Sequence, residues 1–205
     1  MVQLGVWVSP TTTVACKLPH MSVARSPQHQ AALAAKFDGT VQAGAQLVVA
    51  AGEACVFARY GAPLRILQAG SYEVPAEYAG PDVEVWFVWT KPHVGVKFGG
   101  PLGVMPTPMG NLTKAFGEYT LRVIEPSAFF KNFAGSAQSS LPLQDVTSFI
   151  NTKMLSSLKV SIGKRASGFN PGMVEEIVDE VVSNVNGEVG SSGMQVEAFG
   201  NLNLM

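Results

Sequence analysis

The sequence predicts an α+β fold, in which a twisted antiparallel sheet is followed by a helical segment and a closing strand. Three observations lead there: short runs rich in Val, Phe, Tyr and Trp over residues 40–125, helical spacing after Pro126, and renewed alternation from Met194 to Leu204. The chain is accordingly divided into an N-terminal segment of uncertain structure (1–39) and one domain (40–205), with a β-rich part (40–125), a helical part (126–188) and the closing strand (194–204).

Glycine and proline interrupt the β-rich part at short intervals, which is typical of an antiparallel sheet with tight turns. The expected strands lie near residues 45–51, 53–59, 64–67, 83–90, 93–98 and 116–124. The glycine-rich stretch 98–103 is predicted to be a turn between strands, because it has neither the Lys-Ser/Thr of a P-loop nor the strand-to-helix setting of a dinucleotide site. An alanine-rich stretch at 30–36 is expected to form a helical turn or two.

Amphipathic helices are expected after the sheet, near residues 126–134, 142–163 and 171–187. The second has one apolar stripe that ends at Gly163, and the third begins after Asn170-Pro171, where proline's missing N–H does no harm. Large apolar side chains at the inward positions of these elements form the predicted core: Val48, Val56, Phe57, Trp86, Phe87, Tyr119, Leu121, Phe129, Phe149, Ile177 and Val181.

Charge and composition exclude several classes of partner. Fourteen Lys and Arg against fifteen Asp and Glu leave a net charge of −1, so no electrostatic excess draws the chain to nucleic acid. Charged residues make up 14%, below the roughly 25% of soluble domains, which predicts that copies of the chain cover part of one another's surface as a homo-oligomer. Two cysteines, no apolar run of spanning length and no signal peptide predict a cytoplasmic protein, attached at most peripherally to the inner face of the membrane.

No catalytic, cofactor-binding or metal-binding residue is predicted, and the chain is not expected to be an enzyme. His20, His29 and His93 lie in no ligand spacing, and Cys16 and Cys55 do not complete a zinc set. No GxSxG elbow is present either. The basic residues after Gly163 lie at a helix C-terminus, where the dipole disfavours anions, and the acidic run 175–180 reads as a solvated helix face.

Several blocks resemble the SPFH domain family of stomatin, prohibitin and flotillin. They are residues 45–57 (AQLVVAAGEACVF), Gly61, residues 68–72 (QAGSY), 84–88, 96–101 and 116–130 (FGEYTLRVIEPSAFF). The last block is the most specific, because it resembles the family's "G-x-Y-x-x-R-I-x-D-P-x-x-F" junction between strand and helix. Ala69 stands where the family usually has proline. The resemblance covers about residues 40–204 and is closest to the bacterial virion-core-protein-like branch, whose zinc ribbon this chain, with two cysteines, does not carry.

The resemblance implies a non-enzymatic scaffold that self-associates and organises or recruits partners at a membrane surface. The alternative is a β-rich module without a membrane role, in which the loops between residues 99 and 111 shape a pocket for a small ligand. A membrane or subunit contact is assigned to Leu4, Val6, Trp7 and Val8, because tryptophan favours the water–lipid boundary. The alternation of Val2, Leu4, Val6 and Val8 also fits an edge strand, or a segment packed into the core or against a neighbouring subunit.

Overall fold

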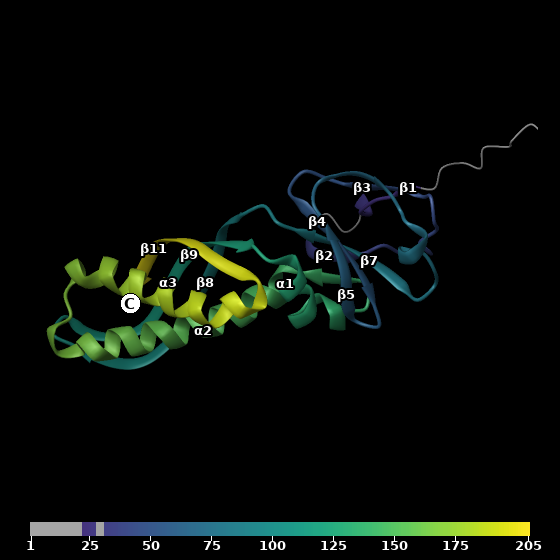
Figure 1. Cartoon of the computed structure of the whole chain (residues 1–205). Coiled ribbons are helices and arrows are strands. Elements are labelled where there is room, and N and C mark those ends of the chain that lie inside the picture. Colours follow the sequence, from purple (N-terminus) through teal and green to yellow (C-terminus); the bar gives the residue numbers. More distant parts are fainter. Residues whose placement is uncertain (1–21, 28–30) are drawn as a thin grey trace, which may run out of the picture.

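The protein folds into two lobes, seen side by side in Figure 1, and the α+β class is confirmed. The structure is a computed structural model that describes residues 22–27 and 31–205. The first lobe holds two sheets and a short helix, and the second holds one sheet and two long helices. The single sheet predicted for the β-rich part, residues 40–125, is therefore wrong, because its strands divide among three sheets.

The first lobe is built on a five-stranded sheet with the order β10-β2-β7-β4-β5. A smaller sheet, β1-β3-β6, covers one face, and helix α1 packs on the other. The elements are β1 (Ser22–Val23), β2 (Ala32–Lys36), β3 (Gln46–Val49), β4 (Glu53–Arg59), β5 (Ala62–Leu67), β6 (Gly70–Glu73), β7 (Val83–Trp89), β10 (Ser140–Pro142) and α1 (Pro126–Asn132), with 3₁₀ turns at Ala76–Tyr78 and Ala134–Ser136.

Alternation along the central strands supplies both faces of this lobe. Phe57 and Phe87 point to the smaller sheet, whereas Trp86 meets Phe130 of α1 edge-on, with ring centroids 5.8 Å apart. Helix α1 begins where the sequence block 116–130 predicted a junction. Glu125 caps it by accepting hydrogen bonds from the backbone N–H groups two and three residues later, with proline at the first helical position.

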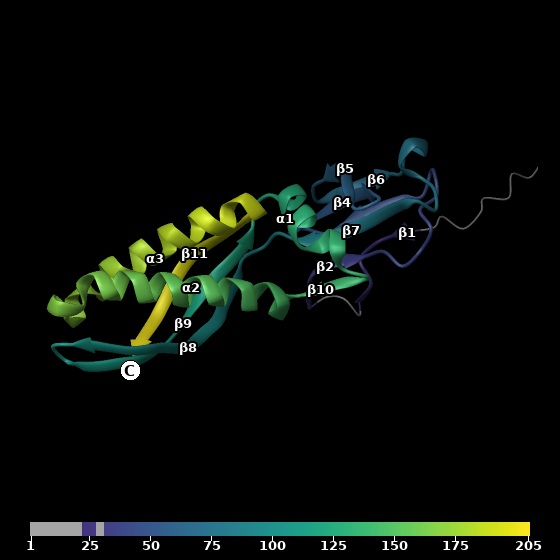
Figure 2. The same ribbon diagram turned by 90° about the horizontal axis from the view of Figure 1, so that it is seen from below.

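The second lobe is a three-stranded antiparallel sheet, β11-β9-β8, covered on one face by two helices (Figures 1 and 2). Its elements are β8 (His93–Thr107), β9 (Gly110–Val123), α2 (Leu143–Arg165), α3 (Val174–Val189) and β11 (Met194–Leu204), with 3₁₀ turns at Ala166–Gly168, Pro171–Met173 and Gly190–Ser192. Buried residues of the sheet pack with the apolar stripes of both helices in one continuous core. The three helices and the closing strand thus lie close to where they were predicted.

Two local predictions are wrong. The alanine-rich stretch 30–36 is not helical over its described part, because Ala32–Lys36 is a buried strand paired on both sides. The glycine-rich stretch 98–103 lies inside β8, and the chain reverses at residues 108–109 instead. Glycine at positions 99 and 117 leaves room for an aromatic ring of the neighbouring strand. A Cβ on Gly99 would lie 2.4 Å from the ring of Phe116, and one on Gly117 would lie 2.4 Å from the ring of Phe98.

Nine of the eleven predicted core residues are buried, and two are not. Val48 is 40% exposed, because Leu47 and Val49 point inward and leave it on the outer face of β3. Phe149 is 36% exposed at the edge of the stripe on α2, where its ring meets that of Phe133 at 5.6 Å. The stripe itself is correct, since its other members are fully buried: Val146, Ile150, Met154, Leu158 and Ile162.

Candidate functional site

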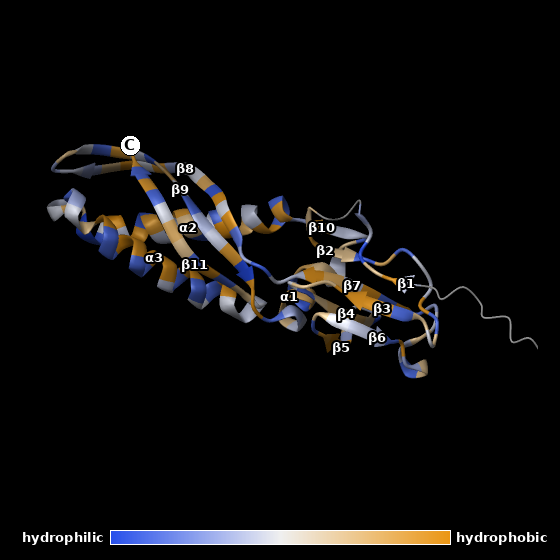
Figure 3. Cartoon of the chain, turned by 90° about the horizontal axis from the view of Figure 1, so that it is seen from above, coloured by the Kyte–Doolittle hydropathy of each residue, from blue (hydrophilic) through white to orange (hydrophobic). Residues whose placement is uncertain are grey.

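The sheet of the second lobe has one face that neither helix covers, and we call it the open face. It lies on the side of β8, β9 and β11 away from α2 and α3 (Figure 3). Phe116 is 40% exposed in the middle of it, and its ring rests against Gly99 of the neighbouring strand. The rest of this face includes charged and small residues of the three strands: Lys97, Lys114, Glu118, Arg122, Glu197 and Gly200.

Charges of both signs are ordered on the open face. Lys114 and Glu118 lie two residues to either side of Phe116 on β9, so all three side chains point the same way. Lys97 is the cross-strand partner of Glu118. Arg122 reaches Glu197 of β11 at 3.1 Å. A surface with alternating signs around one exposed aromatic ring is suited to contact with a surface of the same kind.

The edges of this sheet are unsuited to the addition of another strand. Strand β8 has register shifts after His93 and after Pro101, and it contains two prolines, at 101 and 106. Strand β11 has two register shifts as well, and Asn201 adopts a positive φ of 53°. Bulges and prolines are the devices that protect edge strands from pairing with another chain. A partner therefore has access to the face of the sheet rather than to its edges.

Three segments at the distal end of the second lobe contain no Asp, Glu, Lys or Arg, and we call them the charge-free end: residues 98–113, 166–174 and 198–205. Val104, Met109 and Met205 expose 72%, 63% and 63% of their surface there. The same segments enclose an apolar groove of about 400 Å³. Only residues 109–111 of the loops predicted to shape a ligand pocket line this groove, since most of the stretch 99–111 is strand.

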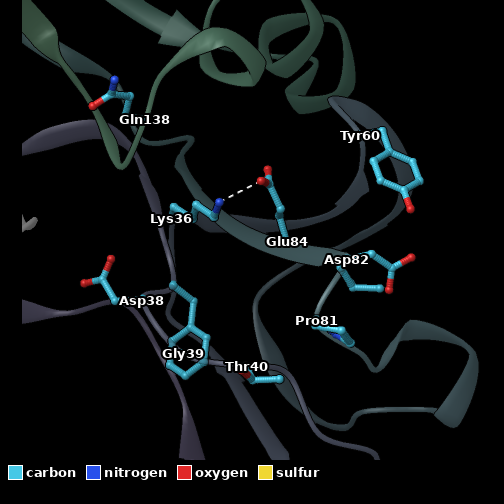
Figure 4. A pocket seen from close by; sticks show the side chains of 11 residues that line it. Lys36, Asp38, Gly39, Thr40, Tyr60, Pro81, Asp82, Glu84 and Gln138 are labelled. Carbon is cyan, nitrogen blue, oxygen red and sulfur yellow. Dashed lines mark hydrogen bonds and ion pairs between the residues drawn. The ribbon is translucent and has the colours of Figure 1, made fainter.

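A polar cavity of about 570 Å³ opens in the first lobe (Figure 4). Four separate segments surround it: residues 36–40 at the end of β2 and just after it, the β4–β5 turn, residues 81–84 at the start of β7, and Gln138. Figure 4 shows Tyr60 and Asp82 on one side and Asp38 and Gln138 on the other, with Lys36 and Glu84 between them. Because the lining comes from distant parts of the chain, only the completed fold reveals this cavity.

Two hydrogen bonds hold Glu84 in place at the polar cavity. Its carboxylate accepts hydrogen bonds from Lys36 Nζ at 2.6 Å and from the indole N–H of Trp86, a buried core residue, at 3.1 Å. Burial raises the pKa of Glu84, but the bonds from Lys36 and Trp86 and the charge of Lys36 outweigh it and leave the pKa below its usual value. On the other side, Arg59 Nε lies 2.8 Å from Asp82 Oδ2, outside hydrogen-bond geometry.

The titratable side chains of the described residues do not form a metal-binding cluster. Over residues 22–27 and 31–205, no three His, Cys, Asp or Glu side chains gather where a metal ion could be held. The His93 ring is tilted by 45° to the Trp89 ring, with centroids 6.0 Å apart. Burial, followed by the nearby charge of Arg25, lowers the pKa of His93. Cys55 is buried, and burial, followed by the charge of Glu53, raises the pKa of its thiol.

Several residues named from the sequence lie outside the described residues. They are the proposed contact residues Leu4, Val6, Trp7 and Val8, together with His20, His29 and Cys16. No protein-family model matches the chain, and no curated protein is significantly similar to it. The resemblance to SPFH domains therefore stays a prediction.

Proposed function

We propose that the protein is a non-enzymatic scaffold that works by self-association, and that the open face is where two copies meet. The observation that carries the proposal is the pattern Lys114-Phe116-Glu118 on an uncovered strand. A two-fold axis beside Phe116 and across the strands brings the two phenyl rings together. The same axis places Lys114 of each copy opposite Glu118 of the other, so the surface complements itself.

The expected affinity of this contact is modest. Burying an aromatic side chain contributes about 1.5 to 3 kcal/mol, and ion pairs at the rim contribute about 1 kcal/mol or less each. These gains compete with the loss of translational and rotational freedom on association. A weak and readily reversible dimer follows, with a dissociation constant on the order of 1 mM. The small share of charged residues in the chain, 14%, and the resemblance to SPFH domains support the same conclusion.

The membrane part of the proposal rests on the distal end. Across the described residues, no helix has both the length and the apolar character to cross a bilayer. The charge-free end, with Val104 and Met109 exposed, is suited to shallow contact with the boundary of a bilayer. Because the two-fold axis reverses one copy, a dimer presents one such end on each side. We therefore propose a cytoplasmic protein whose dimer contacts a membrane peripherally through the charge-free end of one copy. The charge-free end of the other copy is then available to a second membrane or a partner.

A second candidate function is the binding of a small ligand without a membrane role. The observation in its favour is the polar cavity of the first lobe, which is separate from the open face.

Light scattering after size exclusion, over a range of protein concentrations, tests self-association. The intact chain is expected to pass from monomer to dimer, whereas Phe116→Asp stays monomeric. Lys114→Glu alone and Glu118→Lys alone weaken the dimer by like-charge contact, and the double swap restores it because the charges again match. Val160→Asp is the matched control, since Val160 is 53% exposed on α2, away from the open face. A dimer that survives Phe116→Asp, or a double swap no better than either single change, would sink the proposal.

The same proteins are then floated with vesicles of zwitterionic phosphatidylcholine. Met109→Asp is expected to abolish flotation, and the Val160→Asp control floats like the intact chain. Phe116→Asp keeps some flotation but no longer clusters vesicles, because a monomer has one charge-free end. Equal flotation of the intact chain and Met109→Asp would remove the distal end from the mechanism.

A further inference from the structure

The turn between β4 and β5 places a tyrosine at the mouth of the polar cavity. The loop has two residues, Tyr60 and Gly61, with φ of +52° and +75°. Positive φ at both positions is what a tight hairpin turn requires, and Asn or Gly usually supplies it. A tyrosine in this conformation is uncommon, and it leaves the ring 86% exposed. Local strain of this kind gathers at binding sites, so the ring is a candidate contact for a ligand.

The charged side chains of the cavity wall are paired. Lys36 Nζ lies 2.6 Å from Glu84, and Arg59 Nε lies 2.8 Å from Asp82. Asp38, the third carboxylate of the wall, is not free either. The lining residues, all of which the structure describes, thus supply no unpaired charge that would select an ion. The wall is suited to an uncharged, polar occupant.

Paired charges still form hydrogen bonds with a ligand. The side chains of Lys36 and Glu84 are 31% and 32% exposed, so water reaches both. An ammonium group has three N–H donors, of which the bond to Glu84 uses one, and each carboxylate oxygen accepts more than one bond. The two groups therefore match a pair of neighbouring hydroxyls, one accepting from Lys36 and the other donating to Glu84. Figure 4 shows this pair between Tyr60 and Gln138, whose amide is a further donor and acceptor.

We propose that this cavity binds a neutral sugar in its pyranose form. A pyranose has both chemistries that the wall complements. Its face of C–H groups packs on the exposed ring of Tyr60, and its neighbouring hydroxyls bond to Lys36 and Glu84. The volume of about 570 Å³ lies within the range of small-molecule sites, roughly 300 to 1,000 Å³. This inference rests on the second candidate function, small-ligand binding, and is independent of the open face.

The test is an NMR titration of the intact chain with the methyl pyranosides of glucose, galactose and mannose. At least one of them is expected to shift the signals of residues 36–40, 60 and 81–84, with a dissociation constant on the order of 1 mM. Two further probes separate the two chemistries. Cyclohexylmethanol keeps an apolar ring with one hydroxyl, sorbitol keeps the hydroxyls without a ring, and each is expected to bind about five-fold more weakly or worse.

The outcomes distinguish this inference from the small-ligand function on which it rests. Cavity shifts with cyclohexylmethanol or sorbitol, and none with any pyranoside, would overturn the sugar assignment but leave a small-ligand site. No cavity shift with any probe would overturn the sugar assignment and leave the small-ligand function without support. The Phe116→Asp variant is expected to bind the pyranoside as the intact chain does, so neither result depends on self-association.

Three variants locate the site. Tyr60→Asn removes the ring but suits the turn, so the fold is retained, and it is expected to weaken pyranoside binding about two- to ten-fold. Tyr60→Phe keeps the ring and should bind like the intact chain. Glu84→Gln keeps an acceptor for Trp86 but an uncharged one, and it is expected to weaken binding about three-fold or more. Glu73→Gln, which removes a charge on β6 outside the cavity, is the control. Unchanged affinity in both Tyr60→Asn and Glu84→Gln would contradict a sugar site in this cavity.

Discussion

The two lobes differ in how many faces of their main sheet are covered by other elements. The five-stranded sheet of the first lobe is covered on both faces, so its central strands, EACVFAR and VEVWFVW, are almost continuously apolar. The sheet of the second lobe is covered on one face only, and β9 alternates accordingly between buried and exposed residues. Every second position of β9 is thus free of the packing demands of the core. Residues that bind a partner can stand at these outward-facing positions without loss of stability. The side chains of the open face on β9 occupy them.

Ion pairs follow the same contrast. In the first lobe Arg25 meets Glu53 at 2.9 Å, and their side chains are only 6% and 5% exposed. Arg25 also donates to the carbonyl of Ala32 and lies over the ring of Trp89. In the second lobe Arg122 and Glu197 are 3.1 Å apart with 47% and 29% exposure. The two pairs have similar chemistry but very different access to water, so they offer a direct test of the comparison.

The largest effect is expected from breaking the buried pair. Glu53→Gln removes the charge that compensates Arg25 and is expected to lower the free energy of unfolding by about 3 to 5 kcal/mol. Glu197→Gln is the matched change in the exposed pair and should cost about 1 kcal/mol or less. Urea unfolding of both variants measures the difference. Similar losses in the two variants would mean that burial does not distinguish the pairs.

A second contrast lies within α2, between neighbouring residues. Ile150 is fully buried and Phe149 is 36% exposed. Ile150→Ala is expected to cost about 2 to 5 kcal/mol, because it leaves a cavity in the core. Phe149→Ala should cost about 1 to 2 kcal/mol, because part of its ring already meets water. Thermal or urea unfolding measures both losses of stability. A larger loss for Phe149→Ala than for Ile150→Ala would contradict the partial exposure of Phe149.

Repeating patterns made much of this fold predictable. The period of two in residues 194–204 predicted β11 to the residue, and the helical period predicted the apolar stripe of α2. The stripe's edge was not predictable, because the position of Phe149 depends on where Phe133 lies after α1 has docked. The turn predicted at residues 98–103, which include Gly99, was wrong for a related reason. A glycine that clears space for an aromatic ring on the next strand cannot be told from a turn glycine before the strand register is known.

The candidate sites were less predictable than the fold. Alternation in β9 places Lys114, Phe116 and Glu118 on one side, but the sequence does not say that both helices cover the other side. The polar cavity was missed entirely, because Lys36, Tyr60 and Glu84 become neighbours only through strand pairing. Periodicity in the sequence predicts which side of a single helix or strand is buried. It does not predict surfaces to which several elements contribute.

The smallest expected effect concerns the ion pairs that join the two helices of the second lobe near the distal end. Lys164 Nζ and Arg165 Nη1, at the end of α2, lie 2.8 and 2.6 Å from the two oxygens of Glu180 on α3. Hydrogen bonds from Lys164 and Arg165 hold the pKa of Glu180 at about 2, below its ordinary value of 4.5. A carboxylate whose pKa is lowered by folding adds stability above its ordinary pKa and loses that contribution as the pH falls to the folded value.

Glu180→Gln should therefore unfold slightly more easily than the intact chain above about pH 4.5, and the gap should close between pH 4.5 and 2. The gap should also narrow in high salt, because these groups face water. NMR titration of the Glu180 carboxyl carbon checks the cause, with an expected midpoint near 2. An ordinary midpoint, or a stability gap that does not change with pH, would show that the contacts of Glu180 with Lys164 and Arg165 do not help to hold the two helices together. That outcome would bring the second lobe closer to the first, where buried apolar contacts hold the layers together.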